Sequence, residues 1–187
     1  MGLFYSVLFM FLTTMTSLWP TTVKPFSLRS LTRSAEKIVW VHCKNASPTL
    51  KNGELYTDYE FTVIETIKGL HTPNLRLSLP GGNFQGTNYH IVGMPIFNPG
   101  TEELLFLTHA PKKNSAWPIG LYQGAARIIR DRNGIDHIFP RQKPLLTETS
   151  TSRKLASPNQ NYNFSGKPLD NVLIHIRSLI SGRSNDH

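Results

Sequence analysis

The chain has 187 residues, of which 39% are hydrophobic and 17% are charged. This composition is typical of a globular protein and excludes an intrinsically disordered one. The formal net charge is +8, but the basic residues are scattered and are not interleaved with aromatic ones. We therefore expect a solvated basic surface and do not expect nucleic acid as a partner.

The chain begins with an apolar segment, residues 2–19, that contains no charged side chain. This start predicts a signal peptide and hence an extracytoplasmic protein, either periplasmic or secreted. The alternative is an uncleaved membrane anchor, because the segment is close to the length of a spanning helix. We assign residues 1–20 to this leader and 21–35 to a polar connector. About 165 residues remain behind the leader, which fits one domain.

Residues 36–139 show the pattern of a mainly β protein, and we predict a small antiparallel OB-like barrel. Predicted strands occupy 38–43, 56–67, 75–79, 89–92 and 103–108, and turn residues separate them. Two further arms, 120–130 and 135–139, flank Asn133-Gly134, a dipeptide that favours a type I′ hairpin turn. Strands and helices do not alternate, so we do not expect a parallel doubly wound sheet.

The C-terminal part of the chain contains two further predicted segments. Residues 140–166 are rich in Ser, Thr, Pro and Asn without a hydrophobic period, which predicts a flexible linker. Residues 167–182 predict an amphipathic helix. Its apolar face contains Leu169, Val172, Leu173, Ile176 and Ile180. This face predicts that the helix docks on the barrel or on a partner.

The residues that could carry chemistry form no catalytic motif. The Gly-rich stretch 81–86 lacks the Lys and Ser or Thr of a phosphate-binding loop. Cys43, the single cysteine, lies in an apolar run that favours a buried hydrophobic role, and it excludes an intramolecular disulfide. The seven histidines show no short metal-ligand spacing. We therefore predict no catalytic residue, metal or cofactor.

The order of the elements resembles that of a known family. The segments that carry the resemblance are 38–42, 56–69 with its Lys68-Gly69 ending, 80–82, 93–97, 104–107 and 120–124. This order is similar to a family of exported, uncharacterised bacterial proteins. Their strand pattern resembles the OB-like barrel of netrin and tissue-inhibitor-of-metalloproteinases modules. Protease inhibition is not implied, because those inhibitors use a disulfide-held N-terminal cysteine and this chain has none.

Two segments, 82–97 and 121–124, form the candidate binding patch. Its residues are Gly82, Phe84, Tyr89, Pro95, Phe97, Tyr122 and Gln123. The alternative for each is a structural role in a turn, in strand geometry or in plugging the open end of the barrel. With the leader, the patch predicts an exported, non-catalytic binding module whose partner is a protein or an envelope component.

Two other functions stay open at this point. One is a metal-dependent or accessory enzyme whose site is built from dispersed His and acidic residues. The other is an OB-type nucleic-acid binder, which the positive net charge suggests.

Overall fold

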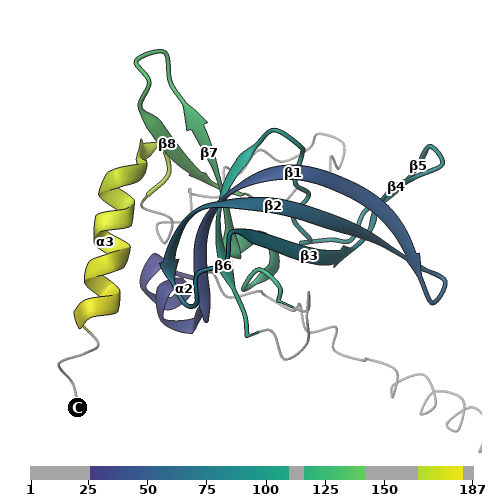
Figure 1. Cartoon of the computed structure of the whole chain (residues 1–187), viewed down its shortest axis with the longest axis horizontal. Coiled ribbons are helices and arrows are strands. Elements are labelled where there is room, and N and C mark those ends of the chain that lie inside the picture. Colours follow the sequence, from purple (N-terminus) through teal and green to yellow (C-terminus); the bar gives the residue numbers. More distant parts are fainter. Residues whose placement is uncertain (1–25, 110–115, 142–163, 183–187) are drawn as a thin grey trace, which may run out of the picture.

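A computed structural model describes residues 26–109, 116–141 and 164–182 (Figure 1). The strands are β1 (Lys37–Lys51), β2 (Glu54–Lys68), β3 (Asn74–Pro80), β4 (Gly82–Phe84), β5 (Thr87–Tyr89), β6 (Glu102–Leu107), β7 (Ala125–Arg130), β8 (Asp136–Pro140) and β9 (Lys167–Pro168). The helices are α2 (Leu28–Ser34), α3 (Leu169–Ser181) and the short 3-10 helix η1 (Leu121–Gly124). The predicted leader, residues 1–20, and most of the predicted linker, residues 142–163, lie outside the described residues.

The prediction of a mainly β, antiparallel fold with a C-terminal helix is confirmed. One antiparallel sheet has the strand order β3-β2-β1-β6-β7-β8-β9, and β4 and β5 form a separate ribbon. Within the described residues this sheet is open, with β3 and β9 as its edges, so the predicted closed barrel is not found. The reason is visible in the pairing: β6 covers β1 only up to His42, whereas β2 follows β1 to its end. The far half of β1 therefore leaves with β2 and β3 and curves away from β7 and β8 (Figure 1).

The central strands are apolar on both faces because the sheet lies between two core layers. Successive side chains of a strand point to opposite faces, so Ile38 packs with the helices and Val39 packs on the other face. The helix-side layer includes Leu31 of α2, Phe106 of β6 and the apolar face of α3. The opposite layer includes Val41, Phe61, Leu77, Met94, Phe97 and Leu105.

Helix α2 stands where the sequence predicted a connector. The Ser27 hydroxyl accepts a hydrogen bond from the Ser30 N–H at 3.1 Å, which caps the helix. Leu31 is fully buried, and the Lys68 ammonium donates to the Thr32 carbonyl at 3.0 Å. With only seven residues, this helix is too short for a periodic apolar signal to stand out in the sequence.

Helix α3 packs on the helix-side layer through Leu169, Val172, Leu173 and Ile176, all of them buried. Its Arg177 also forms an ion pair with Glu65 of β2. Among the described helices, none is long and apolar enough to cross a membrane.

The two Asn-Gly turns differ in geometry. Asn52 and Gly53, between β1 and β2, both have positive φ angles (53° and 83°), as a type I′ turn requires. At the β7–β8 turn Gly134 has a φ of 81°, but Asn133 is not among the residues with positive φ, so the predicted type I′ turn is wrong there. The Asp131 carboxylate explains the difference, because it accepts hydrogen bonds from the Asn133 and Ile135 N–H groups at 2.8 and 2.9 Å.

Candidate functional site

The chain leaves the sheet after β3 through two glycines whose conformation and surroundings exclude larger residues. Gly81 and Gly82 have φ angles of 94° and 138°. A Cβ on Gly81 would lie 2.7 Å from the Tyr89 carbonyl oxygen, and one on Gly82 would lie 2.2 Å from Thr57 Oγ1. The glycines thus allow residues 82–92 to fold back closely against the β1–β2 hairpin.

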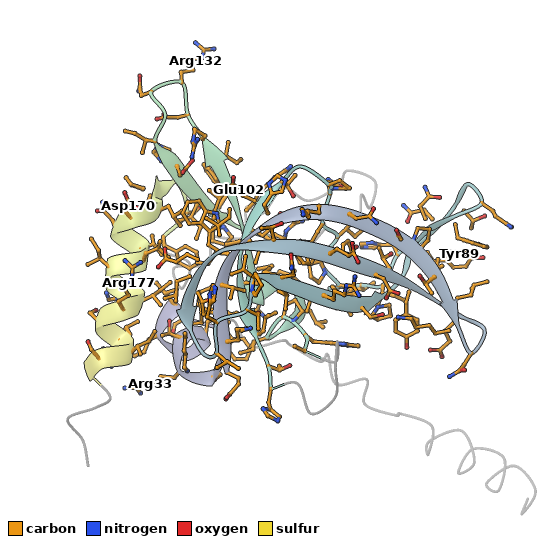
Figure 2. The ribbon with its side chains drawn as sticks, in the orientation of Figure 1. Arg33, Tyr89, Glu102, Arg132, Asp170 and Arg177 are labelled. Carbon is orange, nitrogen blue, oxygen red and sulfur yellow. The ribbon has the colours of Figure 1, made fainter. Side chains whose placement is uncertain are left out.

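Residues 82–92 expose several large apolar side chains. Tyr89 is 52% exposed, Ile91 45% and Val92 59%. The tip of the β1–β2 hairpin is nearby, because the Gly81 N–H donates to the Leu55 carbonyl at 2.8 Å and Leu50 pairs with Leu55. Leu50 is itself 56% exposed. We call Leu50, Tyr89, Ile91 and Val92 the apolar end; Figure 2 shows Tyr89 at the opposite end of the molecule from α3.

Two residues of the predicted patch, Pro95 and Phe97, are buried. The Phe97 ring packs edge-on against Tyr59 and Phe61, with centroids 5.2 and 5.4 Å away. The Arg141 guanidinium lies 5.0 Å from the same ring. Phe97 is therefore a core residue of the described structure, and its contacts give it a packing role.

Tyr122 and Gln123 lie in η1, beside the segment that contains Pro95 and Phe97. The Tyr122 N–H donates to the Gly93 carbonyl at 2.9 Å. Gln123 is buried, and its side-chain oxygen accepts from the Phe26 N–H at 2.8 Å. The predicted patch thus divides: Gly82, Phe84 and Tyr89 belong to the β4–β5 ribbon, Pro95 and Phe97 are buried, and Tyr122 and Gln123 lie in η1. Binding by the ribbon residues stays a prediction.

Glu103 and Arg141 form an ion pair on the same side of the sheet as Phe97. Neither residue was predicted from the sequence as part of a site. Glu103 is fully buried, and both its carboxylate oxygens accept hydrogen bonds from Arg141. Burial raises the pKa of Glu103, and the Arg141 guanidinium opposes that shift. Neighbouring Glu102 faces the other way and accepts from Trp40 Nε1 at 2.9 Å. Adjacent residues of a strand point to opposite faces, so the two carboxylates cannot act as an acid–base pair.

Cys43 is buried in the same layer as Phe97. Burial, and to a lesser extent Glu103, raises the pKa of its thiol, which disfavours the reactive thiolate. The predicted structural role of Cys43, as a small buried hydrophobic residue, fits this environment.

His137 is the described histidine with the most defined polar surroundings. Its Nδ1 lies 3.0 Å from the Gly166 carbonyl oxygen and its Nε2 lies 3.1 Å from Asp131 Oδ2. The Gly166 carbonyl and then Asp131 raise the pKa of this imidazole. Within the described part of the chain, His, Cys, Asp and Glu form no group of three that could hold a metal ion.

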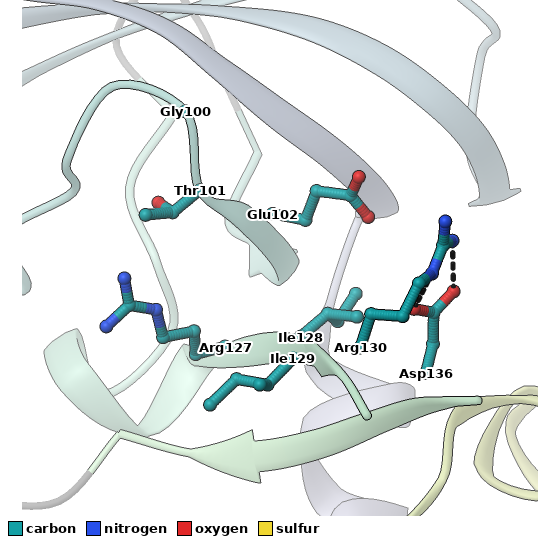
Figure 3. A pocket seen from close by; sticks show the side chains of 8 residues that line it. All are labelled: Gly100, Thr101, Glu102, Arg127, Ile128, Ile129, Arg130 and Asp136. Carbon is teal, nitrogen blue, oxygen red and sulfur yellow. Dashed lines mark hydrogen bonds and ion pairs between the residues drawn. The ribbon is translucent and has the colours of Figure 1, made fainter. Parts of the chain in front are cut away.

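An open pocket of about 470 Å³ lies between the start of β6 and the end of β7 (Figure 3). It is lined by Gly100, Thr101, Glu102, Arg127, Ile128, Ile129, Arg130 and Asp136. Arg130 donates to both carboxylate oxygens of Asp136, at 2.8 and 2.9 Å. The Arg127 side chain is exposed and forms no hydrogen bond with a described side chain, although its charge lowers the pKa of nearby Glu103. The pocket therefore contains one guanidinium that is ion-paired and one that is available to a ligand.

Comparison with known proteins adds no assignment: no protein-family model matches the chain, and a search of curated proteins finds no match. The resemblance to exported bacterial proteins therefore stays a prediction.

Proposed function

We propose that this protein is an exported, non-catalytic interaction module that binds an apolar surface of a partner protein through its apolar end. The observation that carries the proposal is the exposure of Leu50, Tyr89, Ile91 and Val92, each between 45% and 59%, at the β1–β2 hairpin tip and in and just after β5. Exposed apolar side chains that gather in one place mark interaction surfaces in soluble proteins, because covering them with a partner removes apolar area from water.

The surroundings of the apolar end also fit an interface. Tyr89 offers a large ring with few rotatable bonds, and tyrosine is frequent among residues that dominate binding energy. Lys51 follows Leu50 at the hairpin tip and is held by Asp58 at 2.6 Å, so a polar group borders the apolar one. An apolar centre with a polar border is the usual anatomy of a protein–protein interface.

The remaining parts of the proposal rest on the sequence. Export rests on the apolar leader, residues 2–19. The finer likeness to an OB-type module supports the proposal through strand order alone, because the described sheet is open.

Site-specific photo-crosslinking in the producing cells tests the proposal. A photoreactive amino acid replaces Val92 in one full-length variant and Ile174 in another. Ile174 is a matched control, because it is apolar and 61% exposed but lies on α3. We expect one protein to be crosslinked from position 92 and not from 174, and the substitutions Tyr89→Ser and Leu50→Ser to abolish that product. Equal labelling from both positions, or none from position 92, contradicts the proposal.

A further inference from the structure

The pocket between β6 and β7 lies where the sheet divides. The last rung between the two strands joins Glu102 to Ile128, but β7 continues to Arg130. On the β8 side, the Ala125 carbonyl accepts from the Arg141 N–H at 3.1 Å. Backbone groups alternate in direction along a strand, so those of Ile128 and Arg130 are directed toward β6. Arg130 lies beyond the last rung, so its N–H and C=O are directed to the pocket side, where no described residue pairs with them.

Charged side chains near this edge are sorted by face of the sheet. Arg127 pairs in register with Glu103, and Arg141 binds Glu103, so this face has two guanidiniums for one carboxylate. The opposite face carries Arg130 with Asp136 and Glu102, which gives two carboxylates for one guanidinium. Figure 3 shows Arg127 on one side of the pocket and the Arg130–Asp136 pair on the other, with Glu102 directed to the second side.

We propose that this pocket binds an extended peptide segment in which an acidic residue stands next to a basic one. Such a segment lies beside the end of β7, between it and residues 100–101, which stay hydrogen-bonded to Cys43 of β1, and it pairs with the backbone groups of Arg130. Adjacent side chains of an extended peptide point to opposite faces. The acidic side chain then reaches Arg127 and its basic neighbour reaches Glu102, and each pair joins opposite charges.

The site discriminates between peptides by the number of residues that separate the acidic residue from the basic one. Two charges at adjacent positions meet both faces, whereas two charges separated by one residue lie on the same face. This site uses none of the residues of the apolar end, so either proposal can fail without the other.

Chemical-shift perturbation of the full chain with two synthetic peptides tests the inference. The first peptide is acetyl-Thr-Val-Glu-Lys-Val-Thr-amide. The second, acetyl-Thr-Val-Glu-Val-Lys-Thr-amide, has the same composition but both charges on one face. We expect the first peptide to shift the backbone amides of residues 100–102 and 127–130, and to bind at least about fivefold more tightly than the second at low salt.

Variants separate a specific site from general attraction to a basic protein. Arg127→Gln and Glu102→Gln are each expected to weaken binding of the first peptide by about fivefold. Arg132→Gln is the matched control, because Arg132 is not a lining residue and lies at the tip of the β7–β8 hairpin, away from Glu102 (Figure 2); it is expected to leave binding unchanged. The spectra of the variants also report whether each is folded. Equal binding of the two peptides, no effect of Arg127→Gln, or no shift up to about 5 mM peptide overturns the inference.

Discussion

Replacing Arg141 with Met leaves the Glu103 carboxyl buried without its cation, and the consequence depends on pH. The wild-type carboxylate is fully buried and accepts both of its strong hydrogen bonds from Arg141. At about pH 8, folding of the variant has either to bury a lone charge or to take up a proton that the unfolded chain does not hold. Both routes lower the free energy of unfolding.

The size of this loss follows from burial. Removing one partner of a buried ion pair costs about 3–5 kcal/mol. The Arg141 side chain is 22% exposed, which places the expected loss at the lower end; we expect about 3 kcal/mol at about pH 8. Burial keeps the pKa of Glu103 raised, and losing Arg141 raises it further. At about pH 4, near the ordinary pKa of Glu, the unfolded carboxyl is largely protonated too, so the loss shrinks to about 1 kcal/mol.

Urea unfolding followed by tryptophan fluorescence measures both values. Lys51→Met is the matched control, because Lys51 and Asp58 form an ion pair whose side chains are 41% and 39% exposed. An exposed pair contributes at most about 1 kcal/mol, so the control is expected to change little at either pH. The double variant Glu103→Leu/Arg141→Met is expected to recover most of the stability. A loss for Arg141→Met that is the same at both pH values would refute this reasoning.

Three further predictions concern His137, Gly82 and Cys43. The pKa of His137 is raised in the folded protein, so the protonated imidazole stabilises the fold. This stabilisation is fully present below the pKa of the unfolded chain and is lost as pH rises through the pKa of the folded protein. His137→Gln is therefore expected to flatten the dependence of Tm on pH in that window, and an unchanged slope contradicts the prediction. Gly82→Ala is expected to lower the free energy of unfolding in urea by about 2–3 kcal/mol. Gly134→Ala is expected to lower it by about 1 kcal/mol, because no atom lies within 4 Å of the added Cβ. Equal losses would count against the close approach of Gly82 to Thr57. Cys43 is expected to react with a thiol reagent only in urea, and rapid labelling of the native protein would show that the thiol is not shielded.

Elements with a local signal could be predicted from the sequence. Strand β6 was found because its apolar centre is continuous, and α3 because its apolar residues recur on one helical face. The β7–β8 turn was found because the Asn-Gly dipeptide has a backbone preference of its own, although its predicted type I′ geometry was wrong. By contrast, β1 continues to Lys51 through Asn45, Ser47 and Pro48, which are typical of a loop. Pairing with β2 over its whole length extends this strand, and a partner strand is not visible in local sequence.

The site depended even more on contacts between distant residues. Arg141 binds Glu103 from 38 positions away, and no spacing rule connects them. Phe97 was included in the candidate patch as the last residue of segment 82–97, and the fold packs its ring against Tyr59 and Phe61 of β2. Tyr89 was included because it lies in segment 82–97, and its exposure became visible only in the fold. Which apolar residues stay uncovered is decided by packing, and packing is not local.

The most direct test of the central claim is the dissociation constant of the purified protein for the partner captured from position 92. Truncating two half-exposed apolar side chains removes roughly 1 kcal/mol or more each at an interface centre. We therefore expect Tyr89→Ser/Val92→Ser to weaken binding by at least about tenfold, and Ile174→Ser to leave it unchanged. Equal affinity of the double variant and the wild type would contradict the claim that the apolar end is the binding surface.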